Sequence, residues 1–208
     1  MENKQGSLLS QFIYPLLVFL FIIFVSFTSF LTIKCYSAAA KLNCLQNTYE
    51  LMRIKVYGAS YSDAGNTVSA SFSIIDSNGN EIAVFERSWS GSYLGAEFSR
   101  ISLYGKNFVF PVRVFGKNRI ADTGHRSQKG IRLEKYYNDY RQCMLLGHGS
   151  SLKERSELYW LSVFATKKYH LPQFSLVEYI NLDLSTCKSE TYYSVICDEN
   201  GNLSVVEL

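Results

Sequence analysis

Charged residues are scarce in this chain of 208 residues, and so are histidine and proline. Lysine, arginine, aspartate and glutamate together make up 19% of the residues, below the roughly 25% of an average soluble domain. The net charge of +3 is too small to create a broadly positive surface. We therefore expect no nucleic-acid partner.

The motifs of common enzymes and cofactor sites are also missing. The chain contains no G-x-S-x-G, no P-loop, no G-x-G-x-x-G and no H-E-x-x-H. It has no C-x-x-C pair, and its three histidines lie far apart in the sequence. These absences favour a protein without a metal, without a cofactor and without evident catalysis.

What the chain does contain is one long apolar segment, residues 12–33, without an acidic residue, a lysine, an arginine or a histidine. A bilayer core of about 30 Å is crossed by roughly 20 helical residues, so this segment predicts a transmembrane anchor that binds the lipid bilayer. A cleaved signal peptide has a shorter apolar core of about 7–15 residues, which favours an uncleaved signal-anchor behind a tail of residues 1–11.

The side of the membrane is less strongly indicated. Lys4 and the terminal amine precede the anchor, whereas Lys34, Lys41 and Arg53 follow it, a count that leans towards a cytoplasmic C-terminal domain. The low charge, the strand-rich polar composition and the five cysteines favour the other side. We interpret the C-terminal domain as extracytoplasmic.

Apolar residues continue at alternating steps of three and four beyond the anchor, which predicts a stalk helix over residues 34–53. Two interpretations are open: the stalk packs on its own domain, or it joins two copies as a short parallel coiled coil, giving a homodimer. The stripe consists of Cys35, Ala38, Leu42, Leu45, Tyr49, Met52 and Val56.

Residues 54–208 predict an α+β domain in which an antiparallel sheet carries about two helices on one face. Two segments with the pattern D-x-N-G-N, residues 76–80 and 198–202, each separate alternating apolar runs. Asn-Gly tolerates positive φ, so both segments predict hairpin turns. Neither has the glycine and glutamate spacing of an EF-hand loop.

Further strands are predicted over residues 98–104, 108–115 and 174–184, with Pro111 marking an edge strand or a bulge. Helical spacing from Leu133 to Met144 predicts one helix. A second helix follows Ser151, where the S-x-x-E pattern with Glu154 predicts a capping box.

Three places carry side chains suited to binding. His148, Ser150 and Ser151 lie in a glycine-rich loop before the second helix, where free N–H groups favour an anion, although a plain helix cap explains them equally. His125 and Arg126, in the basic segment 117–132, suit phosphate, acidic glycan or lipid head groups, or a solvated loop. The third place holds Trp89 and Tyr93, which suit ring stacking unless Trp89 belongs to the core.

The cysteine spacing limits disulfide formation. Cys35 and Cys44 are nine residues apart on a predicted helix, about 13 Å, whereas disulfide Cα atoms lie at most about 7 Å apart. Cys187 and Cys197 flank a short strand and are the predicted intramolecular pair.

These observations indicate a single-pass, membrane-anchored protein whose extracytoplasmic domain binds or supports an envelope protein or glycan. One alternative is a membrane-anchored hydrolase-like enzyme that uses the His148 loop. The other is a pilin-like subunit: Gly6 after Lys4 resembles the end of a prepilin leader, although Gln11 stands where pilins carry glutamate.

Overall fold

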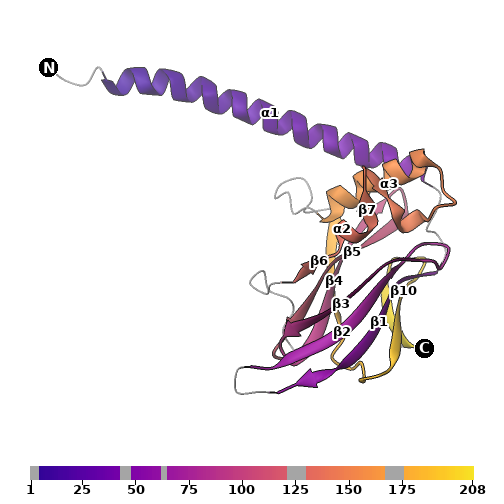
Figure 1. Cartoon of the computed structure of the whole chain (residues 1–208). Coiled ribbons are helices and arrows are strands. Elements are labelled where there is room, and N and C mark those ends of the chain that lie inside the picture. The colour runs from indigo at the N-terminus through magenta and orange to yellow at the C-terminus, as the bar shows by residue number, and fades with distance from the viewer. Residues whose placement is uncertain (1–4, 43–47, 62–64, 121–129, 167–175) are drawn as a thin grey trace.

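The chain forms one long helix that runs into a domain built mainly of strands (Figure 1). This computed structural model describes residues 5–42, 48–61, 65–120, 130–166 and 176–208, and the side chains of the long helix from residue 13 onward. The helix, α1, spans Gln5–Lys41, and its 37 residues extend about 55 Å at a rise of 1.5 Å per residue.

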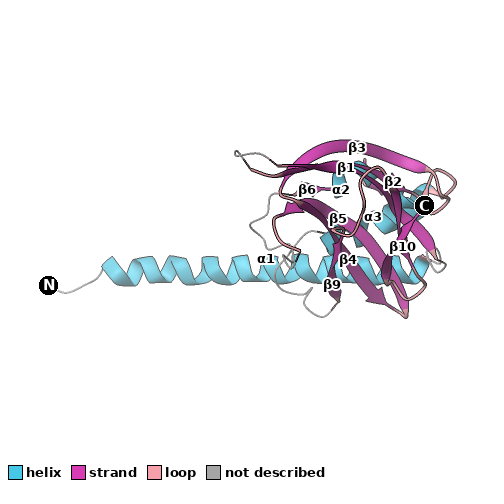
Figure 2. Ribbon diagram, turned by 90° about the horizontal axis from the view of Figure 1, so that it is seen from below, coloured by secondary structure: helices cyan, strands magenta, loops and turns pink. Residues whose placement is uncertain are grey.

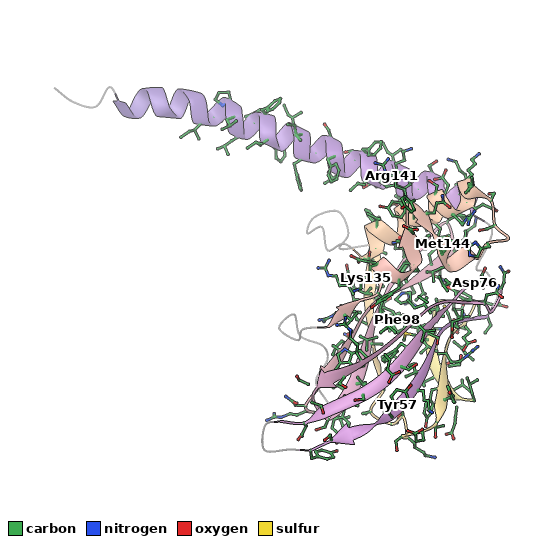
Figure 3. The ribbon with its side chains drawn as sticks, viewed as in Figure 1. Tyr57, Asp76, Phe98, Lys135, Arg141 and Met144 are labelled. Carbon is green, nitrogen blue, oxygen red and sulfur yellow. The ribbon has the colours of Figure 1, made fainter. Side chains whose placement is uncertain are left out.

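Helix α1 has two parts with different surroundings. From Ile13 to Phe30 its side chains are mostly apolar and mostly exposed, and they project on all sides of the helix (Figure 3). From Leu31 onward one stripe is buried against helix α3 (Leu152–Thr166). The stripe consists of Leu31, Cys35, Ala38, Ala39 and Leu42.

The predicted stalk helix over residues 34–53 is correct only as far as Lys41. Strand β1 (Tyr49–Ser60) already contains the last part of that range. It pairs along its length with β2 on one side and β10 on the other, so two ladders of hydrogen bonds override the local helical spacing. Leu45 lies outside the described residues.

The long strands form two antiparallel sheets. The first sheet has the order β11-β10-β1-β2-β3 and contains β2 (Thr67–Ile75), β3 (Glu81–Ser90), β10 (Tyr192–Cys197) and β11 (Leu203–Glu207). The second sheet has the order β6-β5-β4-β9 and contains β4 (Tyr93–Leu103), β5 (Lys106–Lys117), β6 (Ile131–Arg132) and β9 (Val177–Asp183).

Figure 2 shows the sheets as two layers, with β1, β2 and β3 in one and β4, β5 and β9 in the other. A single apolar core contains residues of both sheets, among them Phe72 and Ile54 of the first and Phe98 and Phe110 of the second. The same core includes the buried stripe of α1 and the inner face of α3. The prediction of an α+β domain with antiparallel strands and two further helices is confirmed, with the strands divided between two sheets.

The first D-x-N-G-N segment forms the predicted turn between β2 and β3. The carboxylate of Asp76 accepts hydrogen bonds from the backbone N–H groups of Asn78 and Asn80, each 2.8 Å long. Gly79 has a φ of +82°, in the left-handed region that glycine adopts without strain.

The second D-x-N-G-N segment repeats this turn between β10 and β11. Asp198 accepts from the N–H groups of Asn200 and Asn202 at 2.9 and 2.8 Å, and Gly201 has a φ of +76°. Both hairpin predictions are therefore confirmed, and the two turns share one pattern of side-chain hydrogen bonds.

The predicted strand pair of residues 98–104 and 108–115 is also present, as β4 and β5. Pro111 lies in the interior of the second sheet, where the pairing shifts register between Glu97 and Phe98. This β-bulge accommodates a residue that cannot donate to the ladder, as predicted. The third predicted strand is β9, and Phe174, where that strand was expected to begin, lies outside the described residues.

The helix predicted from Leu133 to Met144 is wrong. Only Glu134–Tyr137 is helical (α2), and a small hairpin follows, made of β7 (Asn138–Asp139) and β8 (Gln142–Cys143). The chain reverses at Tyr140 and Arg141, whose φ angles are +43° and +62°, before a short 3-10 helix, η1 (Met144–Leu146). Tyr137 at the end of α2 and Cys143 after the reversal are both buried in the core.

Candidate functional site

The described residues contain one helix that is long and apolar enough to cross a membrane, within Ile13–Lys41, with a mean hydropathy of 2.7. Only 6% of its most apolar stretch is buried in the protein, so the fold leaves most of these side chains exposed. An apolar helix that the fold leaves bare is suited to a lipid environment.

The junction between this helix and the domain is well packed. The Sγ of Cys35 lies 3.9 Å from the carbonyl oxygen of Trp160 in α3, and Lys41 forms an ion pair of 2.8 Å with Glu157. The Nζ of Lys106, from β5, donates to the carbonyl oxygens of Ala39 and Leu42 at 3.2 and 2.7 Å. A cation beside the last carbonyl groups of a helix stabilises its C-terminus. Lys106 of the domain therefore holds the C-terminal end of α1 in place.

Aromatic side chains and a lysine gather where the exposed part of α1 meets the domain. The rings of Phe30 and Trp160 meet edge to face with centroids 6.4 Å apart, and Tyr159 lies beside Trp160 at 5.8 Å. The ammonium of Lys34 lies 5.7 Å from the centroid of Phe30. Tryptophan, tyrosine and lysine are residue types typical of membrane–water interfaces.

Away from the junction, a cavity of about 550 Å³ lies where β3 approaches β5 and β6. We call it the β3–β6 cavity; Arg87, Ser88, Trp89, Ser90, Gly116, Asn118, Gly130 and Ile131 line it. Its volume falls in the range of about 300–1,000 Å³ typical of ligand pockets. Gly116 is required here, because a Cβ would lie 2.2 Å from the carbonyl oxygen of Ser90.

Trp89 is one wall of this cavity and is also part of the core. Its side chain is 5% exposed, and its ring meets Phe72 edge to face at 5.5 Å. The interpretation of Trp89 as a core residue is therefore correct. Its Nε1 nevertheless has no hydrogen-bond acceptor among the described residues. Tyr93, predicted to stack on the same ligand as Trp89, lines a different cavity of about 230 Å³.

Residues of the loop around His148 stabilise the fold. Ser151 caps α3: its Oγ accepts from the N–H of Glu154 at 3.2 Å, while the Glu154 carboxylate accepts from the N–H of Ser151 at 2.9 Å. This confirms the capping box. The Ser151 hydroxyl, which donates to the Glu154 carboxylate at 2.7 Å, and then the Ser151 N–H hold the pKa of Glu154 below its usual value. An acidic side chain thus already lies at the helix N-terminus where an anion was predicted.

The rest of the loop rests on the β2–β3 turn. Figure 3 shows Asp76 and Met144 at this end of the domain, and the N–H of Ser77 donates to the carbonyl of Leu145 at 2.8 Å. Gly147 packs so closely that a Cβ would lie 2.4 Å from the Asp76 carboxylate. His148 itself is exposed, and Ser150 donates from its Oγ to the Gly147 carbonyl at 2.7 Å.

Cys143, the cysteine nearest to His148 in the sequence and so the candidate nucleophile for the enzyme alternative, is fully buried. Burial raises the pKa of its thiol to about 12, so almost none of it is the reactive thiolate at neutral pH. His125 and Arg126 lie outside the described residues. Among the described residues, no cluster of three His, Cys, Asp or Glu side chains is arranged to hold a metal ion.

The disulfide predicted between Cys187 and Cys197 is not formed, because both are free thiols. In the register of β1 and β10, Cys197 lies opposite Tyr49 at one end of β10. Cys187 lies beyond the other end of β10, where it lines a cavity with Val56 and Gly58. Several strand residues, at about 3.3 Å each, separate these positions, more than a disulfide can bridge. Burial raises the pKa of each thiol to about 11.

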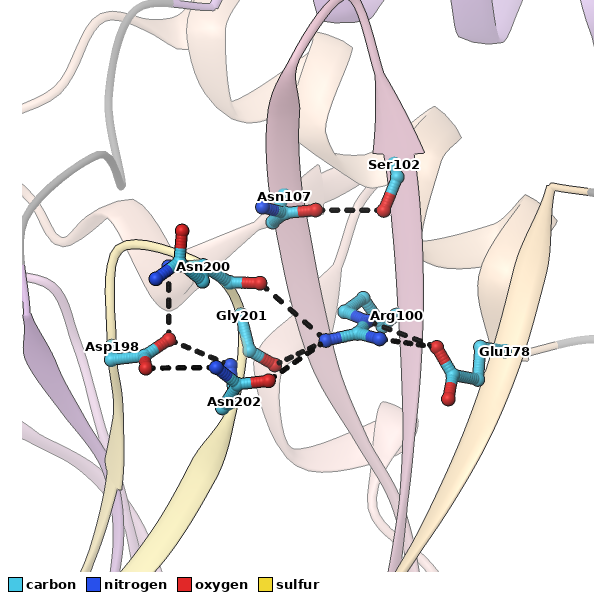
Figure 4. A network of polar contacts seen from close by, with 8 residues as sticks. All are labelled: Arg100, Ser102, Asn107, Glu178, Asp198, Asn200, Gly201 and Asn202. Atoms are coloured by element: carbon cyan, nitrogen blue, oxygen red, sulfur yellow. Dashed lines mark hydrogen bonds and ion pairs between the residues drawn. The ribbon is translucent and has the colours of Figure 1, made fainter.

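Sequence reasoning missed a polar network that ties the two sheets together (Figure 4). Arg100 of β4 donates to the Glu178 carboxylate on β9, and its Nη1 lies 3.3–3.4 Å from three oxygens of the β10–β11 turn. Those oxygens belong to Asn200, Gly201 and Asn202. One guanidinium therefore fixes the second turn of the first sheet against the second sheet.

The sequence interpretation also missed Arg87 as a residue that lines the β3–β6 cavity, although the alternation of side chains along β3 singles it out. Arg87 alternates with Phe85 and Trp89 along β3, and both of these aromatic side chains are buried. A cation on the apolar face of a strand is unusual, and it could have been recognised from its spacing alone.

Comparisons of the chain with protein-family models, with curated proteins and with solved structures give no match. Its function must therefore be argued from the exposed apolar helix, the packed junction and the β3–β6 cavity.

Proposed function

We propose that this chain is a single-pass membrane protein whose domain lies outside the cytoplasm and works by binding or structural contact within an envelope assembly. The observation that carries the proposal is the division of α1: a bare apolar part from Ile13 to Phe30, and a part from Leu31 onward that belongs to the domain core. Such a helix anchors the domain at a fixed height and angle above the bilayer.

A binding role is supported by what the candidate side chains do. Ser151 caps a helix together with Glu154, and Cys143, the thiol that would act with His148 in an enzyme, is buried and unreactive, so His148 has no activated nucleophile from Cys143 beside it. The β3–β6 cavity, by contrast, has an exposed cation, Arg87, that forms no ion pair within the described part of the chain. A negatively charged group of a ligand or a partner could pair with it.

The extracytoplasmic side is supported by composition. The domain has few charges and is rich in serine, asparagine and tyrosine on strands, a mixture suited to wet sheet surfaces. The positive charges that follow the anchor in the sequence point the other way. Labelling therefore has to decide the side.

The test has two parts, both done on the full chain in cells. Alkaline carbonate extraction should leave the protein in the membrane pellet, because high pH detaches peripheral proteins but does not release a helix that spans the bilayer. A cysteine introduced at Tyr61, which is 69% exposed, should react with a membrane-impermeant maleimide in intact cells. Release by carbonate would overturn the anchor, and labelling only after lysis would overturn the orientation.

A pilin-like subunit is the second candidate, and α1 favours it, because its N-terminal part is bare while its C-terminal part packs on a strand-rich domain. In a filament the bare parts would bundle together. N-terminal sequencing of protein from cells decides this candidate: processing after Gly6 supports it, and an intact N-terminus excludes it.

A further inference from the structure

The small hairpin of β7 and β8 turns at two residues that hold an unusual backbone conformation. Tyr140 and Arg141 alone join the two strands, with φ angles of +43° and +62°. A two-residue turn with both φ angles positive is normally Asn-Gly or Gly-Gly, because bulkier side chains are strained in the left-handed region. The fold therefore gives up stability to present a tyrosine and an arginine at this tip.

The side chains of the tip are exposed and unmatched. Tyr140 is 91% exposed, a larger fraction than that of any other large apolar side chain in the described part of the chain. Asp139 and Arg141, on either side of it, are also exposed, and neither forms an ion pair with another described residue. The tip thus carries an aromatic ring, an anion and a cation for which the fold supplies no partner.

The base of the hairpin is fixed to α3. The side-chain amide of Asn138 donates to the Oγ of Ser162 at 2.8 Å. The tip and the C-terminal half of α3 line one cavity of about 230 Å³. We call this region the hairpin–α3 surface; it consists of Asp139, Tyr140, Arg141, Tyr159, Val163 and Thr166.

The direction of α3 sets the height of this surface relative to the anchor. Glu157 pairs with Lys41 near the end of α1, whereas Trp160 meets Phe30, so α3 runs antiparallel to α1. Thr166 is six residues beyond Trp160 and lies about 9 Å further along α3, towards the bare part of α1. The hairpin–α3 surface therefore begins near the level at which the bare part ends.

The figures place the hairpin at the same end of the domain. Figure 1 shows β7 next to α3, and Figure 3 shows Arg141 at the end to which α1 is attached, whereas Tyr57 lies at the opposite end. If the bare part from Ile13 to Phe30 spans the bilayer core, as proposed above, the hairpin–α3 surface lies at the depth of the lipid headgroups.

We infer that the hairpin–α3 surface rests on zwitterionic phospholipid headgroups of the bilayer that holds α1. Arg141 pairs with a lipid phosphate, Asp139 pairs with a headgroup ammonium, and the ring of Tyr140 lies beside the glycerol groups. Arginine binds phosphate through two parallel hydrogen bonds, and tyrosine is enriched at membrane interfaces. A zwitterionic headgroup supplies a partner for both unmatched charges.

This inference rests on the proposed anchor and adds a second contact to it. A helix that crosses the bilayer can tilt, and its tilt is set by packing and by interfacial side chains. The hairpin–α3 surface is such an interfacial contact on the domain itself. It would hold the domain at one angle to the membrane.

The test places a fluorescent reporter at the tip of the full-length protein in phosphatidylcholine nanodiscs. Tyr140→Trp is made in a chain that also carries Trp160→Phe, so that buried Trp89 gives a constant background. Lipids brominated close to the glycerol end of the acyl chain quench nearby tryptophan. Tyr61→Trp in the same chain is the matched control, because Tyr61 is 69% exposed and follows the end of β1 that lies beyond Tyr57.

We expect brominated lipid to lower the emission of the reporter at position 140 at least twofold and to leave the emission of the reporter at position 61 unchanged. Adding Arg141→Gln should halve the quenching at position 140. Adding Arg87→Gln, a change at an exposed arginine on the edge strand β3, should not alter it.

A second measurement needs no substitution at the tip. Hydroxyl-radical oxidation of the natural chain in nanodiscs, read by mass spectrometry, should modify Tyr61 more than Tyr140, although Tyr140 is the more exposed of the two in the protein alone. Stronger oxidation of Tyr140, or equal quenching at positions 140 and 61 in protein that co-purifies with nanodiscs, would overturn the surface and leave the anchor intact. Failure of the chain to enter nanodiscs would overturn the anchor and the surface with it.

Discussion

Phe30 of α1 and Trp160 of α3 meet edge to face, with ring centroids 6.4 Å apart, at the point where the bare part of α1 ends. One ring belongs to the candidate membrane span and the other to the domain. The contact packs α1 against the domain. Cys35 against the Trp160 carbonyl and Lys41 against Glu157 continue the contact away from the bare part.

The first prediction concerns truncation. A variant that begins at Thr28 should fold like the full chain, because it keeps the whole buried stripe of α1. A variant that begins at residue 43 removes Leu31 and Leu42 and exposes the face of α3 they cover, so its unfolding free energy should fall by more than about 3 kcal/mol. Urea unfolding followed by circular dichroism measures both, and equal midpoints would show that α1 adds nothing to the core.

The second prediction separates the two equivalent turns. Gly79→Ala should cost about 1 kcal/mol, since φ is +82° and nothing lies within 4 Å of an added Cβ. Gly201→Ala should cost about 2–3 kcal/mol, because its Cβ would also lie 2.9 Å from Arg100 and from Asn107. Chemical denaturation midpoints compare the two variants, and a larger loss at Gly79 would contradict the packing of the second turn against β4.

The third prediction concerns acid. The hydrogen bonds from Asn202, then Asn200, together with the charge of Arg100, hold the pKa of Asp198 below its ordinary value of 3.8. A carboxylate with a lowered folded pKa contributes stability that is present above pH 3.8 and is lost as the pH falls through the folded value.

Asp198→Asn should therefore be less stable than the natural chain near neutral pH, and the difference should shrink below about pH 3.8. Urea midpoints measured at several pH values give the comparison, with Glu199→Gln, a change at the exposed neighbouring position, as the control. A difference that stays constant down to pH 2 would show that the charge of Asp198 is not what holds the turn.

The fourth prediction concerns the thiols. Cys187 and Cys197 lie too far apart to bridge, so both should remain free in protein from any compartment. Their raised pKa values, about 11 for each, should make both slow to alkylate at pH 7 in the folded protein and fast after unfolding. Mass spectrometry without reduction checks this, and a peptide pair linked through Cys187 and Cys197 would refute it.

Local patterns predicted the features that depend on local chemistry. The Asn-Gly turns, the capping box at Ser151 and the bulge at Pro111 each follow from a few neighbouring residues, and each is present. The apolar helix follows from composition alone.

The errors have a common physical cause, which is tertiary pairing. Residues 49–53 keep a helical spacing but pair with two strands, and the segment from Leu133 to Met144 reverses at Tyr140 and Arg141. The disulfide prediction was wrong because sequence separation does not report that Cys197 ends β10 whereas Cys187 lies beyond the opposite end of that strand. The β3–β6 cavity was out of reach, because it joins a strand near residue 89 to strands near residues 116 and 131.

The most direct test of the account is hydrogen exchange of the full-length protein in lipid nanodiscs, read as peptides from α1 and α3. The account predicts that amides of residues 31–41 exchange as slowly as those of the buried half of α3, since both belong to one core. It also predicts that residues 13–30 are protected in the bilayer, where water does not reach their amides. Rapid exchange over residues 31–41, beside a protected α3, would show a loose stalk and would contradict the account.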